Sequence, residues 1–151
     1  MGDAQRMRKL ITAGLLLSLV ACSDVMEESY ASWADADRAG AVERGWVPAF
    51  VPVSAHDISD LHDLDTNAQT LAFATRPSDV QAMVAGLHSV SASDKSAAAE
   101  LSRGLGLPDA SEAYVICSEP LNGSLVVDRK SGRAVYRTPV EWTDDDCSQA
   151  T

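Results

Sequence analysis

The first 21 residues have the organisation of a secretory signal, so they are not expected to belong to the folded domain. Arg6, Arg8 and Lys9 precede a leucine-rich stretch, residues 10–21, that carries no charge. Such a stretch is too short for a permanent membrane-spanning helix and is removed on export. The sequence therefore predicts a signal peptide at residues 1–21. It leaves residues 22–151 to fold, a length that suits a single domain.

The end of the leader, Leu19-Val20-Ala21-Cys22, resembles the lipobox of bacterial lipoproteins. This resemblance implies that Cys22 is lipidated and that residues 22–28 form a short tether, since several acyl chains together give stable attachment. Ser23 rather than an aspartate follows Cys22, which favours the outer membrane, with the domain facing the periplasm. The alternative is a plain secretory signal that happens to precede a cysteine.

The charge of the chain excludes one class of partner. Twelve Lys and Arg stand against 22 Asp and Glu, a formal net charge of -10. The leader contributes more basic than acidic residues, so the remainder is more acidic still. Nucleic acid is therefore not expected as a partner, because its phosphates need a basic surface. Anionic headgroups would also repel the domain, so the lipid is expected to hold it at the membrane.

Two cysteines remain after Cys22, and they are expected to pair. Cys117 and Cys147 lie in a chain bound for an oxidising compartment, where disulfides form and persist. The alternatives are two unpaired thiols or a redox pair. A thioredoxin-like role has little support, because the sequence contains no Cys-x-x-Cys spacing.

The remaining chain, residues 29–151, is expected to form a small single α+β domain with an antiparallel sheet and two to three short helices. Helices are predicted at residues 29–39, ended by Gly40, and at 94–103, ended by Gly104. Another helix begins with a capping box of Ser78 and Gln81, and its apolar residues Val80, Met83, Val84 and Leu87 are spaced to face the core. His88 would then lie at the C-terminal end of this helix.

Strands are predicted where apolar residues alternate or cluster between turn signals. An extended segment up to Asn67 and a strand at residues 69–75 are joined by the turn Asp65-Thr66-Asn67. Further strands are expected at residues 113–117, 125–128 and 134–137. The last two flank a short polar loop containing Gly132, which indicates a hairpin.

Two prolines shape the segment Gly45-Trp46-Val47-Pro48-Ala49-Phe50-Val51-Pro52. They preclude a regular helix and favour an extended, ordered segment. Trp46 and Phe50 are expected to pack into the core. The alternative is that this aromatic pair forms an exposed recognition surface.

The segment from Ser54 to Asn67 is the densest in chemically active side chains. A metal site can be drawn from His56, His62, Asp63 and Asp65, because imidazole and carboxylate ligands suit zinc or a related ion. The two histidines are six residues apart, on one side of a strand but not of a helix, and no His-x-x-x-His pair occurs. The competing interpretation is a polar loop in which the aspartates form turns.

The proline-containing segment, followed by Ser54-Ala55, Ile58 and His62-Asp63-Leu64-Asp65-Thr66-Asn67, resembles a pattern found in small uncharacterised lipoproteins of Gram-negative bacteria. The resemblance spans residues 41–73. It implies a bacterial envelope protein, and it carries no assigned activity.

Catalytic motifs are missing from the sequence. There is no Gly-x-Ser-x-Gly, and Gly104-Leu105-Gly106 is followed by Leu107-Pro108 rather than by a helix-opening phosphate loop. An enzyme, such as a hydrolase, is therefore a minority hypothesis, and no cofactor is expected. The sequence favours a lipid-anchored envelope protein that binds another envelope protein, as an accessory or inhibitor-type lipoprotein. The alternative is a metal-binding or ion-sensing protein that uses the His56–Asp65 segment.

Overall fold

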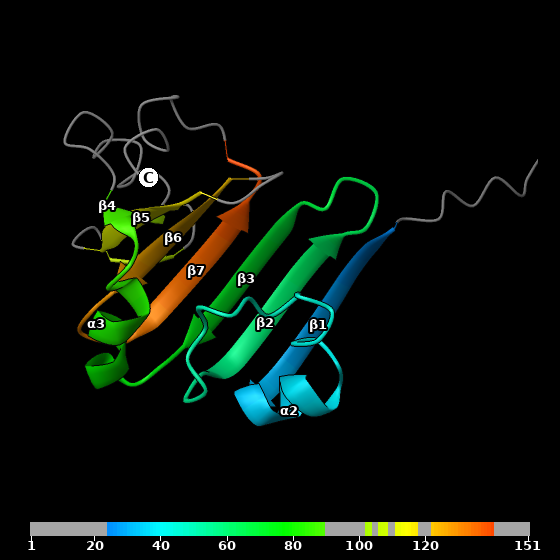
Figure 1. Cartoon of the computed structure of the whole chain (residues 1–151), viewed down its shortest axis with the longest axis horizontal. Coiled ribbons are helices and arrows are strands. Elements are labelled where there is room, and N and C mark those ends of the chain that lie inside the picture. Colours follow the sequence, from blue (N-terminus) through cyan, green and yellow to red (C-terminus); the bar gives the residue numbers. More distant parts are fainter. Residues whose placement is uncertain (1–23, 90–101, 104–105, 109–110, 118–121, 141–151) are drawn as a thin grey trace, which may run out of the picture.

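The fold is built around one twisted antiparallel sheet. The computed structural model describes residues 24–89, 102–103, 106–108, 111–117 and 122–140. Seven strands pair in the order β1-β2-β3-β7-β6-β5-β4, and every neighbouring pair is antiparallel. Figure 1 shows β1 and β2 at one side of the sheet and β5 and β4 at the other. The expected antiparallel sheet is thus confirmed.

The chain enters the sheet earlier than the sequence indicates. Strand β1 spans Val25–Ser32 and helix α2 only Trp33–Arg38. The predicted tether of residues 22–28 and helix of residues 29–39 are therefore wrong in part, because both overlap a strand that pairs with β2. Ser32 caps α2, since its hydroxyl accepts a hydrogen bond from the Asp35 amide at 3.2 Å. Gly40, with a φ of 77°, ends the helix as predicted.

The hairpin in the middle of the chain is confirmed. Strand β2 spans His56–Asp63 and β3 spans Gln69–Ala74. Asp63 shapes the turn between them, because its Oδ1 accepts hydrogen bonds from the amides of Asp65 and Thr66 at 2.9 and 3.1 Å. These backbone donors, above all Thr66, lower the pKa of Asp63.

Helix α3 spans Pro77–Val84 and differs from the prediction in its cap. Arg76 is the N-cap residue, its side chain makes no capping bond, and Pro77 opens the helix. Ser78 instead donates to Asp79 at 3.2 Å, so the predicted capping box is wrong. The buried face is confirmed in Val80, Met83 and Val84.

Past α3 the chain returns to the sheet. His88 lies in strand β4, His88–Ser89, and not at the end of a helix. Of the helix predicted at residues 94–103, only the last two residues lie in the described part, and both are helical. The amides of Gly106 and Leu107 bond to the carbonyls of Arg103 and Ser102. This pattern is that of a helix-terminating glycine at Gly106, φ 68°, whereas Gly104, the predicted terminator, lies outside the described residues.

The last three strands agree closely with the sequence pattern. They are β5 at Glu112–Ile116, β6 at Gly123–Asp128 and β7 at Arg133–Thr138. The β6–β7 hairpin closes at Gly132, which has a φ of 72°. Because β7 pairs with β3, it joins this C-terminal part of the sheet to the β1–β2–β3 part.

The main core lies between one face of the sheet and the segments that cover it, which are α2, residues 41–55 and α3. Its central side chains come from alternate sheet positions: Ile58, Leu71, Phe73, Leu125, Val127 and Tyr136. A smaller cluster on the other face packs Leu107 against β5, β6 and β7. The covering segments also bring residues 49–53 beside α3.

The described residues bear on two predictions from the sequence, the fold class and the disulfide. The described residues are mainly β-structure, with α2 and α3 as short helices, so the α+β class fits only loosely. Cys117 follows β5 directly, whereas Cys147 lies outside the described residues, and their pairing stays a prediction. In the described part of the chain, no helix is long and apolar enough to cross a membrane.

Candidate functional site

A groove lies between the proline-containing loop and helix α3. It has a volume of about 420 Å³. We call it the α3 groove, and its lining is Ala49, Phe50, Val51, Pro52, Val53, Arg76, Asp79, Ala82 and Met83. Val53 is 75% exposed, more than any other large apolar side chain in the described residues. The groove thus combines apolar side chains with the charged pair of Arg76 and Asp79.

The loop side of the groove is held in shape by two turns, not by the extended segment expected. The Val51 amide bonds to the Pro48 carbonyl at 3.0 Å, and the Ala55 amide to the Pro52 carbonyl at 2.8 Å. Each proline therefore begins a turn, in which its carbonyl accepts the closing hydrogen bond. Phe50 is half-buried, and its ring meets Tyr136 edge to face with centroids 5.2 Å apart. It is at once a core contact and part of the groove wall.

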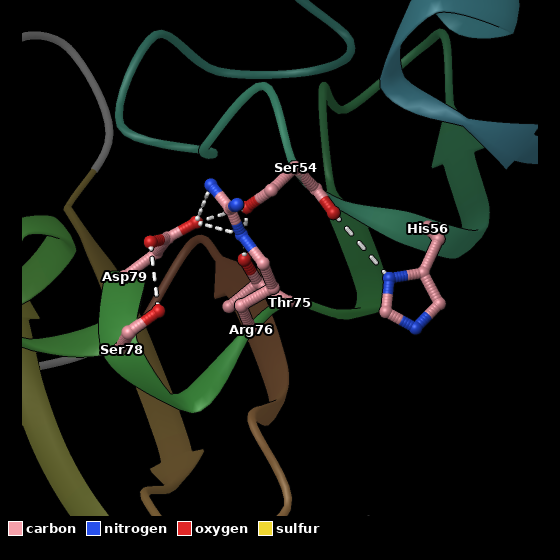
Figure 2. A network of polar contacts seen from close by, with 6 residues as sticks. All are labelled: Ser54, His56, Thr75, Arg76, Ser78 and Asp79. Atoms are coloured by element: carbon pink, nitrogen blue, oxygen red, sulfur yellow. Dashed lines mark hydrogen bonds and ion pairs between the residues drawn. The ribbon is translucent and has the colours of Figure 1, made fainter.

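A polar network fastens the loop to the start of α3, as Figure 2 shows. Asp79 Oδ2 accepts hydrogen bonds from the Ser54 hydroxyl at 2.5 Å and from Arg76 Nε at 2.9 Å. The Thr75 hydroxyl lies 2.8 Å from the Ser54 hydroxyl. The bond from Ser54, followed by that from Arg76, lowers the pKa of Asp79. Asp79 is therefore charged at neutral pH and ties both walls of the groove together.

We expect Asp79→Ala to loosen the groove without unfolding the sheet. The substitution removes the acceptor shared by Ser54 and Arg76, so the loop amides of Val51 and Ala55 should exchange their hydrogens several-fold faster. Native-state hydrogen exchange measures this directly. The matched control is Asp37→Ala, which removes an exposed carboxylate on α2. Equal exchange at Val51 and Ala55 in both variants would show that Asp79 does not hold the loop.

The arrangement of Ser54, His56 and Asp79 is not that of a hydrolase. His56 Nδ1 lies 3.4 Å from the backbone carbonyl oxygen of Ser54, while the Ser54 hydroxyl donates to Asp79. Figure 2 shows the imidazole directed away from the aspartate. A nucleophilic serine needs the histidine as its base, with the carboxylate behind the histidine. Ser54 and Asp79 instead belong to the contacts that hold the loop to α3.

Trp46 lies apart from the groove, over a buried polar cluster. Its ring centroid is 5.5 Å from that of His62 and 4.0 Å from the Arg44 guanidinium carbon. Both aromatic residues singled out in the sequence pack against the core, as predicted. Phe50 also lines the α3 groove and Trp46, which is half-buried, does not; the alternative that the pair forms a recognition surface stays a hypothesis.

The polar cluster under Trp46 centres on Asp60, which is 2% exposed. Gln69 Nε2 donates to Asp60 Oδ1 at 2.6 Å and to the Trp46 carbonyl at 2.5 Å. Burial raises the pKa of Asp60, and the bond from Gln69 partly opposes this. Gln69 thereby fixes the loop to strands β2 and β3.

The metal hypothesis gains no support from these positions. His62 is 9% exposed and its ring lies tilted against that of Trp46, whereas His56 is exposed beyond a bulge at Asp57, which has a φ of 51°. The bulge breaks the two-residue alternation on which the six-residue spacing argument rests. Asp63 is engaged by the turn, and Asp65 is exposed. Within the described ranges, no group of three or more His, Cys, Asp or Glu residues is placed to hold a metal ion.

Comparison with known proteins finds a similarity to a protein-family model. Residues 24–74 match the family model of the YbbD head domain, about a third of the chain. The match spans β1, α2, the proline-containing loop, β2 and β3, and it contains the segment of residues 41–73 singled out in the sequence. No curated protein and no solved structure matches the chain. The matched part includes the loop wall of the α3 groove and not its helical wall.

Proposed function

We propose that this chain is a lipid-anchored bacterial envelope protein that acts as a binding module. Cys22 would carry the lipid at the periplasmic face of the outer membrane. The domain would bind another envelope protein, as an accessory or inhibitor-type lipoprotein does. The observation that carries this proposal is the α3 groove, which combines an exposed apolar rim with firmly anchored walls.

The groove lies at the far end of the sheet from the anchor. Strand β1 starts at Val25 next to the N-terminal segment, and β2 begins at His56 at the opposite end. Eight residues of strand separate the two ends by about 25 Å. A domain tethered through Cys22 would therefore present the groove away from its own point of attachment, where a second protein has access.

The chemistry of the groove indicates the kind of partner. Phe50, Val53 and Met83 offer apolar surface, and Asp79 beside Arg76 offers a charged edge. The volume is large enough for one or two apolar side chains of a partner segment, and it also lies in the range of small-molecule pockets. The net charge of -10 favours a partner with a basic surface, since complementary charge speeds association.

A photo-crosslinking residue at position 53 tests the proposal in intact envelopes. Val53 is exposed at the groove, so we expect a discrete crosslinked partner that depends on Cys22. The control is the same residue at position 59, because Ser59 is exposed on the opposite face of the sheet. A partner captured at position 53 and not at position 59, and lost in Cys22→Ser, supports the proposal. Identical background at both positions would overturn it.

A further inference from the structure

Three of the four exposed large apolar side chains in the described residues gather at one end of the sheet. Val25 is 46% exposed, Leu61 46% and Leu64 45%. Val25 opens β1 and pairs with Asp63, while the Leu64 amide bonds to the Asp24 carbonyl at 3.0 Å. We call these three residues the end patch. It surrounds the point where the N-terminal segment joins the sheet, which Figure 1 shows at the free end of β1.

We infer that the end patch lies against the lipid bilayer and sets the orientation of the domain on the membrane. This inference rests on the proposed anchoring through Cys22. Only two residues separate Cys22 from Val25, and at full extension they reach about 10 Å. Such a short connection keeps this end of the sheet at the membrane surface, so the apolar side chains that meet the lipid are those of the end patch.

Arg137 lies beside the end patch and is also suited to contact with lipid. Arg137 is exposed and lines a hollow of about 260 Å³ together with Val25, Leu61 and Thr70. The described residues place no carboxylate within salt-bridge distance of its guanidinium. An arginine flanked by apolar side chains can extend its head to a lipid phosphate while its stem stays against them. The end patch with Arg137 thus matches an interface of acyl chain and headgroup.

The acidic residues nearby limit how strong this contact is. Asp24 and Asp63 flank the patch, and Asp63 keeps its charge because its pKa is lowered. Carboxylates are repelled by anionic headgroups, and single arginine contacts with lipid are weak. The patch is therefore expected to orient a domain that the lipid already holds, and not to bind membranes without the lipid.

Paramagnetic broadening tests the orientation in the lipidated protein. It is placed in nanodiscs of phosphatidylethanolamine and phosphatidylglycerol that carry nitroxide-labelled lipid. We expect loss of methyl signal intensity at Val25, Leu61 and Leu64. Val53 is the internal control, because it is exposed at the opposite end of the sheet and should keep its intensity. In Leu61→Asn with Leu64→Asn the short connection still keeps Val25 near the lipid, but the domain should lose its fixed orientation, so the signal of Val53 should broaden more than in the wild type.

The outcomes separate this inference from the anchoring on which it rests. If the mass of the mature protein shows no lipid on Cys22, the anchoring fails and the orientation fails with it. If Cys22 is lipidated and Val53 broadens as strongly as the end patch, the anchoring stands and the orientation is overturned. Broadening that is selective for the end patch in the wild type, with this selectivity over Val53 lost after the Leu61 and Leu64 substitutions, supports both.

Discussion

Gly132→Ala is expected to destabilise the protein by about 3 kcal/mol or more, one of the largest effects of any single substitution in the described residues. Gly132 closes the β6–β7 hairpin at a φ of 72°, where a side chain is strained. A Cβ atom at this position would lie 1.9 Å from the Thr75 carbonyl oxygen, which belongs to the backbone between β3 and α3. Since the Thr75 amide also bonds to the Gly132 carbonyl at 2.9 Å, the chain cannot retreat without losing that contact.

The matched control for this substitution is Gly45→Ala. Gly45 has a similar φ of 79°, but a Cβ there would meet nothing within 4 Å. Gly45→Ala should lower the free energy of unfolding only by the backbone strain, about 1 kcal/mol. Urea unfolding of both variants separates the clash from the strain. Equal midpoints would mean that the approach of Gly132 to Thr75 contributes little to stability.

The sequence predicts the hairpins of this sheet well because their signals are local. Alternating apolar residues and turn residues mark β2–β3 and β6–β7, and Asp63, Asn67 and Gly132 adopt turn conformations there. Strand β1 has no such signal. Its glutamates, serines and alanine resemble a helix start, and only the pairing with β2, about thirty residues away, makes it a strand.

The cap of α3 shows how one neighbour overrides a local motif. Ser78 and Gln81 have the spacing of a capping box, but Pro77 fixes φ at the first helical position and starts the helix two residues earlier. Ser78 is then inside the helix and cannot serve as its N-cap. Asp79 instead accepts hydrogen bonds from the Ser54 hydroxyl and from Arg76. That tertiary contact connects residues far apart in sequence, so no local pattern could show it.

The candidate site was predictable only on its loop side. Phe50 was singled out because prolines flank it, and it does line the α3 groove. Gln69 is not singled out by the sequence motifs, although its position in the apolar pattern of β3 indicates a buried polar side chain. It precedes Leu71 and Phe73 at the same two-residue spacing, so a polar side chain falls on the apolar face of β3. On such a face a glutamine must have a buried partner, and the partner is Asp60.

The buried pair of Asp60 and Gln69 gives the second large expected effect. Gln69→Leu should destabilise the protein by about 2–4 kcal/mol, because it leaves the Asp60 carboxylate and the Trp46 carbonyl without their donor. The double variant Asp60→Leu with Gln69→Leu removes the buried charge as well, so it should cost less than the sum of the two single variants. Urea unfolding of all four proteins measures this coupling. Strict additivity would show that the two side chains do not interact.

The pH dependence of the stability of Asp60→Asn tests how the charge of Asp60 affects the same buried cluster. Burial raises the pKa of Asp60, so the folded protein holds this proton more tightly than the unfolded chain does. The stabilisation that protonated Asp60 gives the folded state is fully present when the pH is below the pKa of this residue in the unfolded chain. It is lost as the pH rises through the pKa of Asp60 in the folded protein.

Asparagine at position 60 keeps an acceptor for Gln69 and carries no charge. Asp60→Asn should therefore be more stable than the wild type at neutral pH, with the difference shrinking as pH falls towards the ordinary aspartate range. The pKa values of Asp63, Asp79 and Asp128 are lowered, so these residues make both proteins less stable as the pH falls. Only the difference in stability between the wild type and the variant therefore reports on Asp60. A variant that is less stable at neutral pH would show that the carboxylate, despite its burial, is held by Gln69 and its neighbours more strongly than it is penalised by leaving water.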